Sequence, residues 1–128
     1  MLTQKTAWIS ASISGLLAVA LGAFGSHALK DLLLANGRQE TYELATRYHF
    51  YHTLAILGVG ILMDKLPGKN IQMSATFMLF GMILFSGSLY LLSLTNITKF
   101  AIITPFGGVC MITGWALLFL AVFKSKKQ

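Results

Sequence analysis

The side chains that could do chemistry in this chain are three histidines, one arginine and a set of hydroxyl groups. His49 and His52 are three residues apart, a spacing that puts both on one side of a helix. With His27 they make three imidazoles, which could bind zinc or copper, and imidazoles on facing helices could bind haem. Cys110 is the single cysteine, lies deeper in a later apolar run and completes no such site. Metal or haem binding stays an open hypothesis, and we assign no metal ligand and no cofactor.

Catalytic motifs are missing from the sequence. It contains no G-x-S-x-G, Walker or H-E-x-x-H pattern. Ser26 and His27 are neighbours, but a nucleophile and its base also need a third group and a substrate pocket. We therefore predict no catalytic residues, and the sequence favours a protein that is not an enzyme.

The composition places these residues in a membrane. Of 128 residues, 55% are hydrophobic and 11% are charged, whereas soluble domains have about 25% charged residues. A chain this short cannot bury so much apolar surface in a soluble core. We predict an integral protein of the cell (inner) membrane, in contact with membrane lipid. The net charge of +6 comes from cations that flank apolar runs, without any recognition motif, so we expect no nucleic-acid partner.

Four charge-poor runs are candidates to cross the bilayer, which takes about 20 apolar residues each. We predict an all-α, antiparallel four-helix membrane bundle that forms a single domain over residues 1–128. The spans are expected at about 7–27, 44–63, 71–93 and 100–123. The second run reaches full length only if it includes Arg47, His49 and His52.

The connections between the runs predict the topology. A short amphipathic segment, Ala28–Leu34, follows the first span and ends at Asn36-Gly37. The other connections are short, so consecutive spans are antiparallel neighbours. Both ends then share one side of the membrane, which collects Lys5, Lys65, Lys69, Lys124, Lys126 and Lys127. Fewer cations lie on the other side, so the positive-inside rule predicts cytoplasmic termini.

Antiparallel threading brings the polar side chains to one depth. At a rise of 1.5 Å per residue, His52 lies about 7–8 Å beyond Arg47, and the serines late in the third span lie at a similar depth. Ionisable groups inside a bilayer are costly and are candidates for function. We predict one polar pocket in the outer leaflet, formed by His27, Arg47, His49, His52, Ser86, Ser88, Tyr90 and Thr104. The simplest interpretation is a hydrogen-bonded structural cluster, and a proton or small-solute path is an alternative.

Small residues recur where spans must approach closely. Helices in lipid associate through close backbone contact and interhelical hydrogen bonds. We predict helix packing at Ser14, Ala18, Gly22, Gly81, Gly87, Gly107, Gly108 and Gly114. Hinges at these glycines are the alternative.

Four ordered motifs carry a family resemblance that covers nearly the whole chain. Gly22–Leu29 reads GAFGSHAL, Tyr48–Ala55 reads YHFYHTLA, Phe85–Tyr90 reads FSGSLY and Ile103–Gly108 reads ITPFGG. Together with Gly114-Trp115, they resemble the small bacterial inner-membrane family typified by YgdD and YwdK, domain-of-unknown-function family four-two-three. The resemblance implies a four-helix membrane protein and no particular activity. Ser26 stands where that family usually has Ala, and His49 where it usually has Gln, so His27 and His52 are better candidates for a shared role.

The sequence therefore favours an integral membrane protein of unestablished molecular function. The leading hypothesis is a structural or accessory membrane bundle that self-associates or joins a larger membrane complex. The first alternative is a small-solute, proton or ion pathway, and the second is a metal- or haem-binding membrane protein.

Overall fold

The computed structural model describes residues 1–66 and 68–125. Its elements are α1 (Gln4–Ser26), α2 (Lys30–Ala35), α3 (Gln39–Leu62), α4 (Lys69–Thr95), the 3-10 helix η1 (Thr98–Ile102) and α5 (Thr104–Phe123). The described residues contain no strand, which confirms the all-α prediction. Pro67 in the second connection and the cations Lys126 and Lys127 lie outside the described residues.

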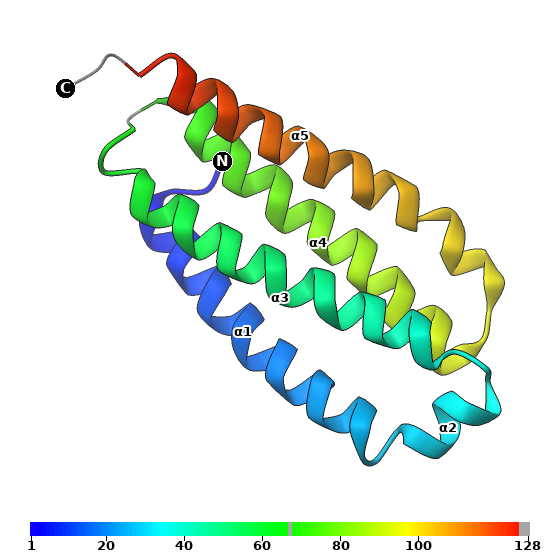
Figure 1. The fold of residues 1–128 in the computed structure, drawn as a ribbon. Helices are drawn as coiled ribbons and strands as arrows, with labels where there is room; N and C mark the ends of the chain where they lie inside the picture. The colour runs from blue at the N-terminus through cyan, green and yellow to red at the C-terminus, as the bar shows by residue number, and fades with distance from the viewer. Residues whose placement is uncertain (67, 126–128) are drawn as a thin grey trace.

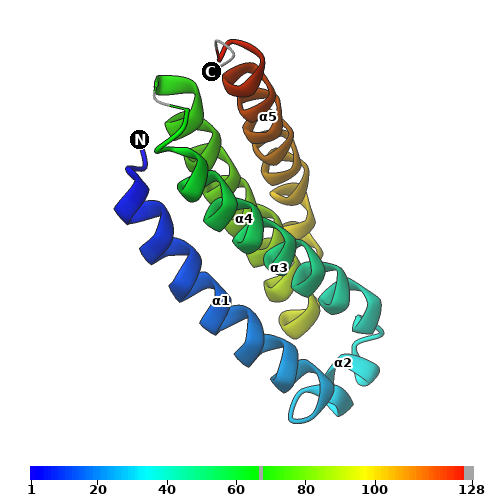
Figure 2. The same ribbon diagram turned by 60° about the vertical axis from the view of Figure 1, so that its left-hand side comes forward.

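The long helices form a layer in which each one packs on the next along the chain. α1 packs on α3, α3 on α4, and α4 on α5, whereas α1 and α4 touch only briefly. Figures 1 and 2 show the long helices side by side in this order, each running back along the one before it. The start of α1 and the end of α5 lie at the same end of the layer. α3 and α4 are therefore the inner helices, and α1 and α5 form the edges.

Among the described residues, three helical segments are long and apolar enough to cross a membrane: Gln4–Ser26, Lys69–Thr95 and Thr98–Phe123. α3 is not among them, because its first half carries Glu40, Glu43 and Arg47 and its middle carries two histidines. It also begins at Gln39, earlier than the predicted start near residue 44. α5 begins at Thr104 instead of residue 100, because the preceding residues form η1 and Pro105 occupies its first turn.

The connection after α1 contains the short helix α2, which buries Leu33 and ends at Ala35, with Asn36 as its C-cap and Gly37 following at a φ of 64°. Leu32 and Leu34 are exposed, and the amphipathic character of this segment stays a prediction. Asn36 donates from its side-chain amide to the backbone carbonyl of Ser93, 3.0 Å away near the end of α4. Arg38 donates to the Asn96 side chain at 2.9 Å. These bonds fix the α2 connection against the loop that follows α4.

Glycines allow α4 and α5 to approach backbone to backbone. A methyl group on Gly81 would lie 2.7 Å from the Met111 nitrogen, and one on Gly107 would lie 2.8 Å from the Gly81 carbonyl oxygen. One on Gly114 would lie 3.0 Å from the Met78 nitrogen. Real Cβ atoms rarely or never lie so close to backbone atoms, so these glycines set the helix separation.

The other predicted packing residues divide into two groups. Ser14 and Ala18 are buried on α1, and Gly22 faces the Thr46 methyl group on α3. Gly108 and Gly87 stand apart from close contacts: a methyl group on Gly108 would be 4.0 Å from the Phe85 ring, and one on Gly87 would meet nothing within 4 Å. Gly87 therefore faces open space.

Candidate functional site

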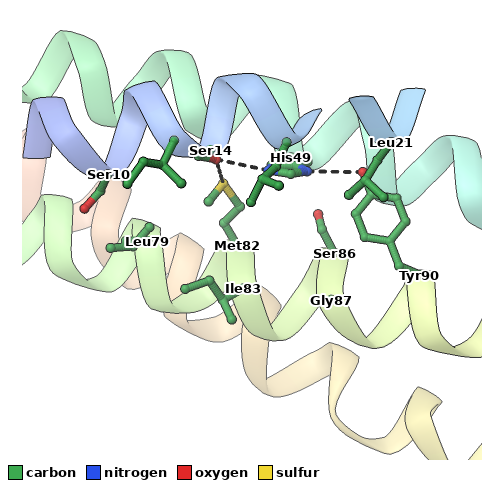
Figure 3. A pocket seen from close by; sticks show the side chains of 12 residues that line it. Ser10, Ser14, Leu21, His49, Leu79, Met82, Ile83, Ser86, Gly87 and Tyr90 are labelled. Carbon is green, nitrogen blue, oxygen red and sulfur yellow. Dashed lines mark hydrogen bonds between the residues drawn. The ribbon is translucent and has the colours of Figure 1, made fainter. Parts of the chain in front are cut away.

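His49 is the centre of a hydrogen-bonded cluster that joins three helices. Its side chain is buried, with its residue 8% exposed. Its Nε2 atom lies 3.0 Å from the Ser14 hydroxyl on α1, and its Nδ1 atom lies 3.2 Å from the Tyr90 hydroxyl on α4. Figure 3 shows the imidazole between these two partners. Both ring nitrogens of His49 are thus used to link neighbouring helices.

The hydrogen bonds of this cluster follow one direction. Tyr90 donates to the Thr46 hydroxyl at 3.3 Å, and Thr46 donates to the Tyr42 carbonyl at 3.1 Å. Because Tyr90 has only one proton, a neutral His49 donates to it from Nδ1 and accepts from Ser14 at Nε2. Thr53 is hydrogen-bonded to Ser14 on the far side. We call the series Thr53, Ser14, His49, Tyr90 and Thr46 the His49 chain.

Two further bonds tie the same helices. Ser86 on α4 donates to the Ala45 carbonyl on α3 at 2.8 Å. Tyr42 on α3 donates to the Leu21 carbonyl on α1 at 2.6 Å, and its ring packs edge-on against the Tyr90 ring. Among the described residues, no buried side-chain nitrogen or oxygen lacks a partner. The cluster is therefore internally satisfied, as buried polar groups in an apolar medium require.

His52 belongs to a different contact. Its Nε2 accepts from the Trp115 indole of α5 at 3.3 Å, and its Nδ1 donates to the Tyr48 carbonyl at 3.0 Å. Residues three apart on a helix point about 60° away from each other. That angle is enough to turn His49 toward α1 and His52 toward α5.

Ser88 and Thr104 form a third contact. Their hydroxyls lie 2.8 Å apart and join α4 to α5. Ser86 and Ser88 are two positions apart, so they face nearly opposite sides of α4. Ser86 and Ser88 lie close together along α4, but they face different neighbouring helices.

His27 and Arg47 lie at the surface. His27 ends α1, where its backbone N–H caps the helix, and its side chain is exposed. Arg47 forms a 3.6 Å ion pair with Glu43, and both side chains are largely exposed. Arg47 and Glu43 also line a cavity of about 420 Å³ at the junction of α1, α2 and α3. The eight residues of the predicted pocket are thus distributed over several places, with His49, Ser86 and Tyr90 together.

The three histidines do not converge on one point. His27 is exposed, and His49 and His52 turn to different neighbours. Across the described part of the chain, no group of three His, Cys, Asp or Glu side chains could hold a metal ion. A three-imidazole centre therefore has no support from this geometry.

The sequence does not reveal several of these contact residues. It predicts only packing for Ser14, and it predicts no site role for Tyr42, Thr46, Thr53 or Trp115. One signal was available: Tyr42, Thr46, His49 and Thr53 recur at spacings of four, three and four, which is one face of a helix. A polar face inside a membrane must point toward other helices.

Comparison with known proteins identifies the family. A family model described as "Protein of unknown function (DUF423)" matches residues 21–108. The chain belongs to the DUF423 family. Its matched region includes His49, Ser86 and Tyr90, whereas Ser14 lies outside it.

The family relatives are named as membrane proteins. The chain is 39% identical to the UPF0382 inner membrane protein YgdD of Escherichia coli (strain K12) over 129 residues, which cover 99% of this chain and 96% of the relative. It is 41% identical to the UPF0382 membrane protein YwdK of Bacillus subtilis (strain 168) over 122 residues, which cover 94% and 98%. No solved structure matches the chain. With its apolar helices, this DUF423 chain is a membrane protein of an uncharacterised family.

Proposed function

We propose that this protein is a four-span antiparallel membrane bundle with a structural or accessory role and both termini in the cytoplasm. The proposal counts α3 as the fourth span, although its composition is too polar to qualify alone. Support comes from its position between α1 and α4, which are both apolar enough to span. A helix that packs along two spanning helices shares their depth, and its polar groups are acceptable because they face those neighbours.

The observation that carries the structural role is the use of both His49 nitrogens between helices. One contacts Ser14 on α1 and the other contacts Tyr90 on α4. Polar groups that satisfy one another across helices add to association in lipid, where burial alone gives no driving force. The polar side chains around His49 thus bond to one another and hold α1 against α3 and α4.

An accessory role requires a partner in the membrane, either a second copy or a larger complex. We expect native mass spectrometry, on protein extracted from its own membrane with mild detergent, to detect an oligomer or a co-purifying membrane protein. The outer side of α5 is the expected contact, because most of its large apolar side chains are exposed. A bare monomer in every mild detergent would contradict the accessory role and leave the four-span bundle untouched.

The second candidate is a proton pathway, and the one-directional His49 chain favours it. Five hydroxyl or imidazole groups follow one another from Thr53 to Thr46. A pathway needs polar groups along its whole length. Beyond Thr53 the helices enclose an apolar core that includes Ala11, Ile56 and Met78, which argues against conduction. Proton flux into liposomes that His49→Leu abolishes would favour this candidate over the structural one.

A further inference from the structure

A groove lies between α1 and α4, with α3 as its floor. It encloses a partly open cavity of about 390 Å³. The groove exists because α1 and α4 touch only briefly, while both pack firmly on their neighbours. Figure 3 shows the two walls and the His49 side chain between them.

The groove is long and narrow. One end lies at Ser10 and Leu79, and the other lies at Leu21 and Tyr90. Each wall therefore covers eleven helical steps, or about 16 Å at 1.5 Å per residue. The volume falls in the range of small-molecule sites, about 300–1,000 Å³. An elongated space of this size, parallel to the helices, suits one extended hydrocarbon chain.

The lining selects an uncharged ligand. Its walls are mainly Leu, Ile and Met side chains, and among the described residues that line it none is Lys, Arg, Asp or Glu. A phosphate or carboxylate at this depth would have no cation to pair with, at a large cost in free energy. Its polar groups are Ser10 at one end, Tyr90 at the other, and Ser14, His49 and Ser86 between them.

Ser86 is the donor in the middle part of the groove, beside Gly87, that a ligand could use. Its hydroxyl donates to the Ala45 carbonyl, which as part of α3 is also the helical acceptor for the His49 backbone N–H. If Ser86 turns to a ligand, the Ala45 carbonyl keeps its helical bond. In contrast, turning Ser14 or Tyr90 would break the His49 chain.

Gly87 gives this part of the groove its free space. It lines the cavity beside Ser86, and a methyl group added there would meet no atom within 4 Å. At the nearby glycines of the α4–α5 contact, in comparison, backbone atoms of the facing helix occupy the space that a side chain would need.

We propose that this groove binds a neutral lipid with one hydrocarbon chain, whose carbonyl oxygen accepts a hydrogen bond from Ser86. The chain lies along α1 and α4, and the carbonyl lies beside Gly87. This inference does not depend on the structural or accessory role.

The test uses the purified full-length protein in phosphatidylcholine nanodiscs and two radiolabelled probes, a long-chain methyl ketone and the alkane of equal length. We expect saturable binding of the ketone at one molecule per chain. Gly87→Leu fills the groove and should lower ketone binding by at least about tenfold. The matched control is Gly58→Leu on α3. An added methyl group there also meets nothing within 4 Å, and Gly58 does not line the groove.

A second variant tests the hydrogen bond itself. Ser86→Ala should lower ketone affinity about threefold to tenfold, the value of one hydrogen bond, and leave alkane binding unchanged. The proposal is overturned if Gly87→Leu binds the ketone like the wild type, or if Ser86→Ala weakens both probes equally. It is also overturned if a fatty acid of equal length competes as well as the ketone, or if Gly87→Leu dissociates a dimer, because a second copy would then fill the groove.

Discussion

At the scale of single residues, the main feature is His49, whose imidazole is buried and hydrogen-bonded at both nitrogens. A buried imidazole with two partners stabilises the helices only while both nitrogens are bonded, because an unpaired polar atom in an apolar medium costs free energy. His52 lies one turn further along α3 and has partners on α3 itself and on α5. The two histidines thus support different helix contacts, and substitutions at each should have separate effects.

Replacing His49 by Leu should lower the free energy of unfolding by about 1–3 kcal/mol, because two interhelical hydrogen bonds are lost and such bonds contribute about 0.6 kcal/mol on average and up to about 1.7. His49→Gln is the matched control, since an amide can still donate and accept. We expect it to cost less than half as much. Unfolding in mixed detergent and SDS micelles, followed by circular dichroism, measures both values. Equal losses in the two variants would show that the hydrogen bonds are not the cause.

At the scale of helices, the layer is held by two unlike contacts. α3 meets α1 and α4 through the His49 chain and through apolar side chains such as Ile56, whereas α4 meets α5 through glycines and direct backbone approach. Ser74 adds a bond of 2.8 Å to the Gly114 carbonyl within the second contact. The α4–α5 contact therefore depends on the absence of side chains at a few positions.

Gly107→Ala should destabilise the fold by about 1–3 kcal/mol, the usual cost of overpacking a filled site. Its new methyl group would meet the backbone of Phe85 and Gly81, which cannot move without shifting α4. Gly108→Ala is the control on the adjacent residue, where the nearest atom would be the Phe85 ring at 4.0 Å. We expect that control to be neutral or slightly stabilising. The same micelle unfolding assay measures both, and a neutral Gly107→Ala would contradict the close approach.

At the scale of the whole molecule, the chain is a layer of helices with an inner pair and two edges. The polar helix α3 is an inner one, and the apolar helices α1 and α5 lie at the edges. This order suits a bilayer, because edge helices contact lipid on most of their surface and inner helices do not. It also leaves the groove between α1 and α4.

The four-span proposal makes a prediction about labelling from outside the cell. In a Cys110→Ala background, Ala35→Cys should react with a membrane-impermeant thiol reagent in intact cells. Lys65→Cys and Lys5→Cys should react only after the membrane is permeabilised. All three positions are exposed in the structure, so access depends on the side of the membrane. Labelling of Ala35→Cys and Lys65→Cys from the same side would mean that α3 does not cross.

The sequence by itself determined the membrane character, the all-α class, the family and the approximate ends of the apolar helices. These properties follow from hydropathy, from turn residues such as Asn36 and Gly37, and from the length that a helix needs to cross a bilayer. Counting residues along antiparallel helices also predicts a shared depth for the polar residues. Apart from the family, each of these properties depends only on where residues lie along the chain.

Only the tertiary structure decided which neighbour each side chain faces. Ser86 and Ser88 are adjacent in depth, yet one bonds to α3 and the other to α5. His49 and His52 separate in the same way, and His27 is left at the surface. The direction of a side chain around a helix has meaning only once the neighbouring helices are fixed, and side-chain packing and backbone approach, as at Gly81 and Gly107, fix them.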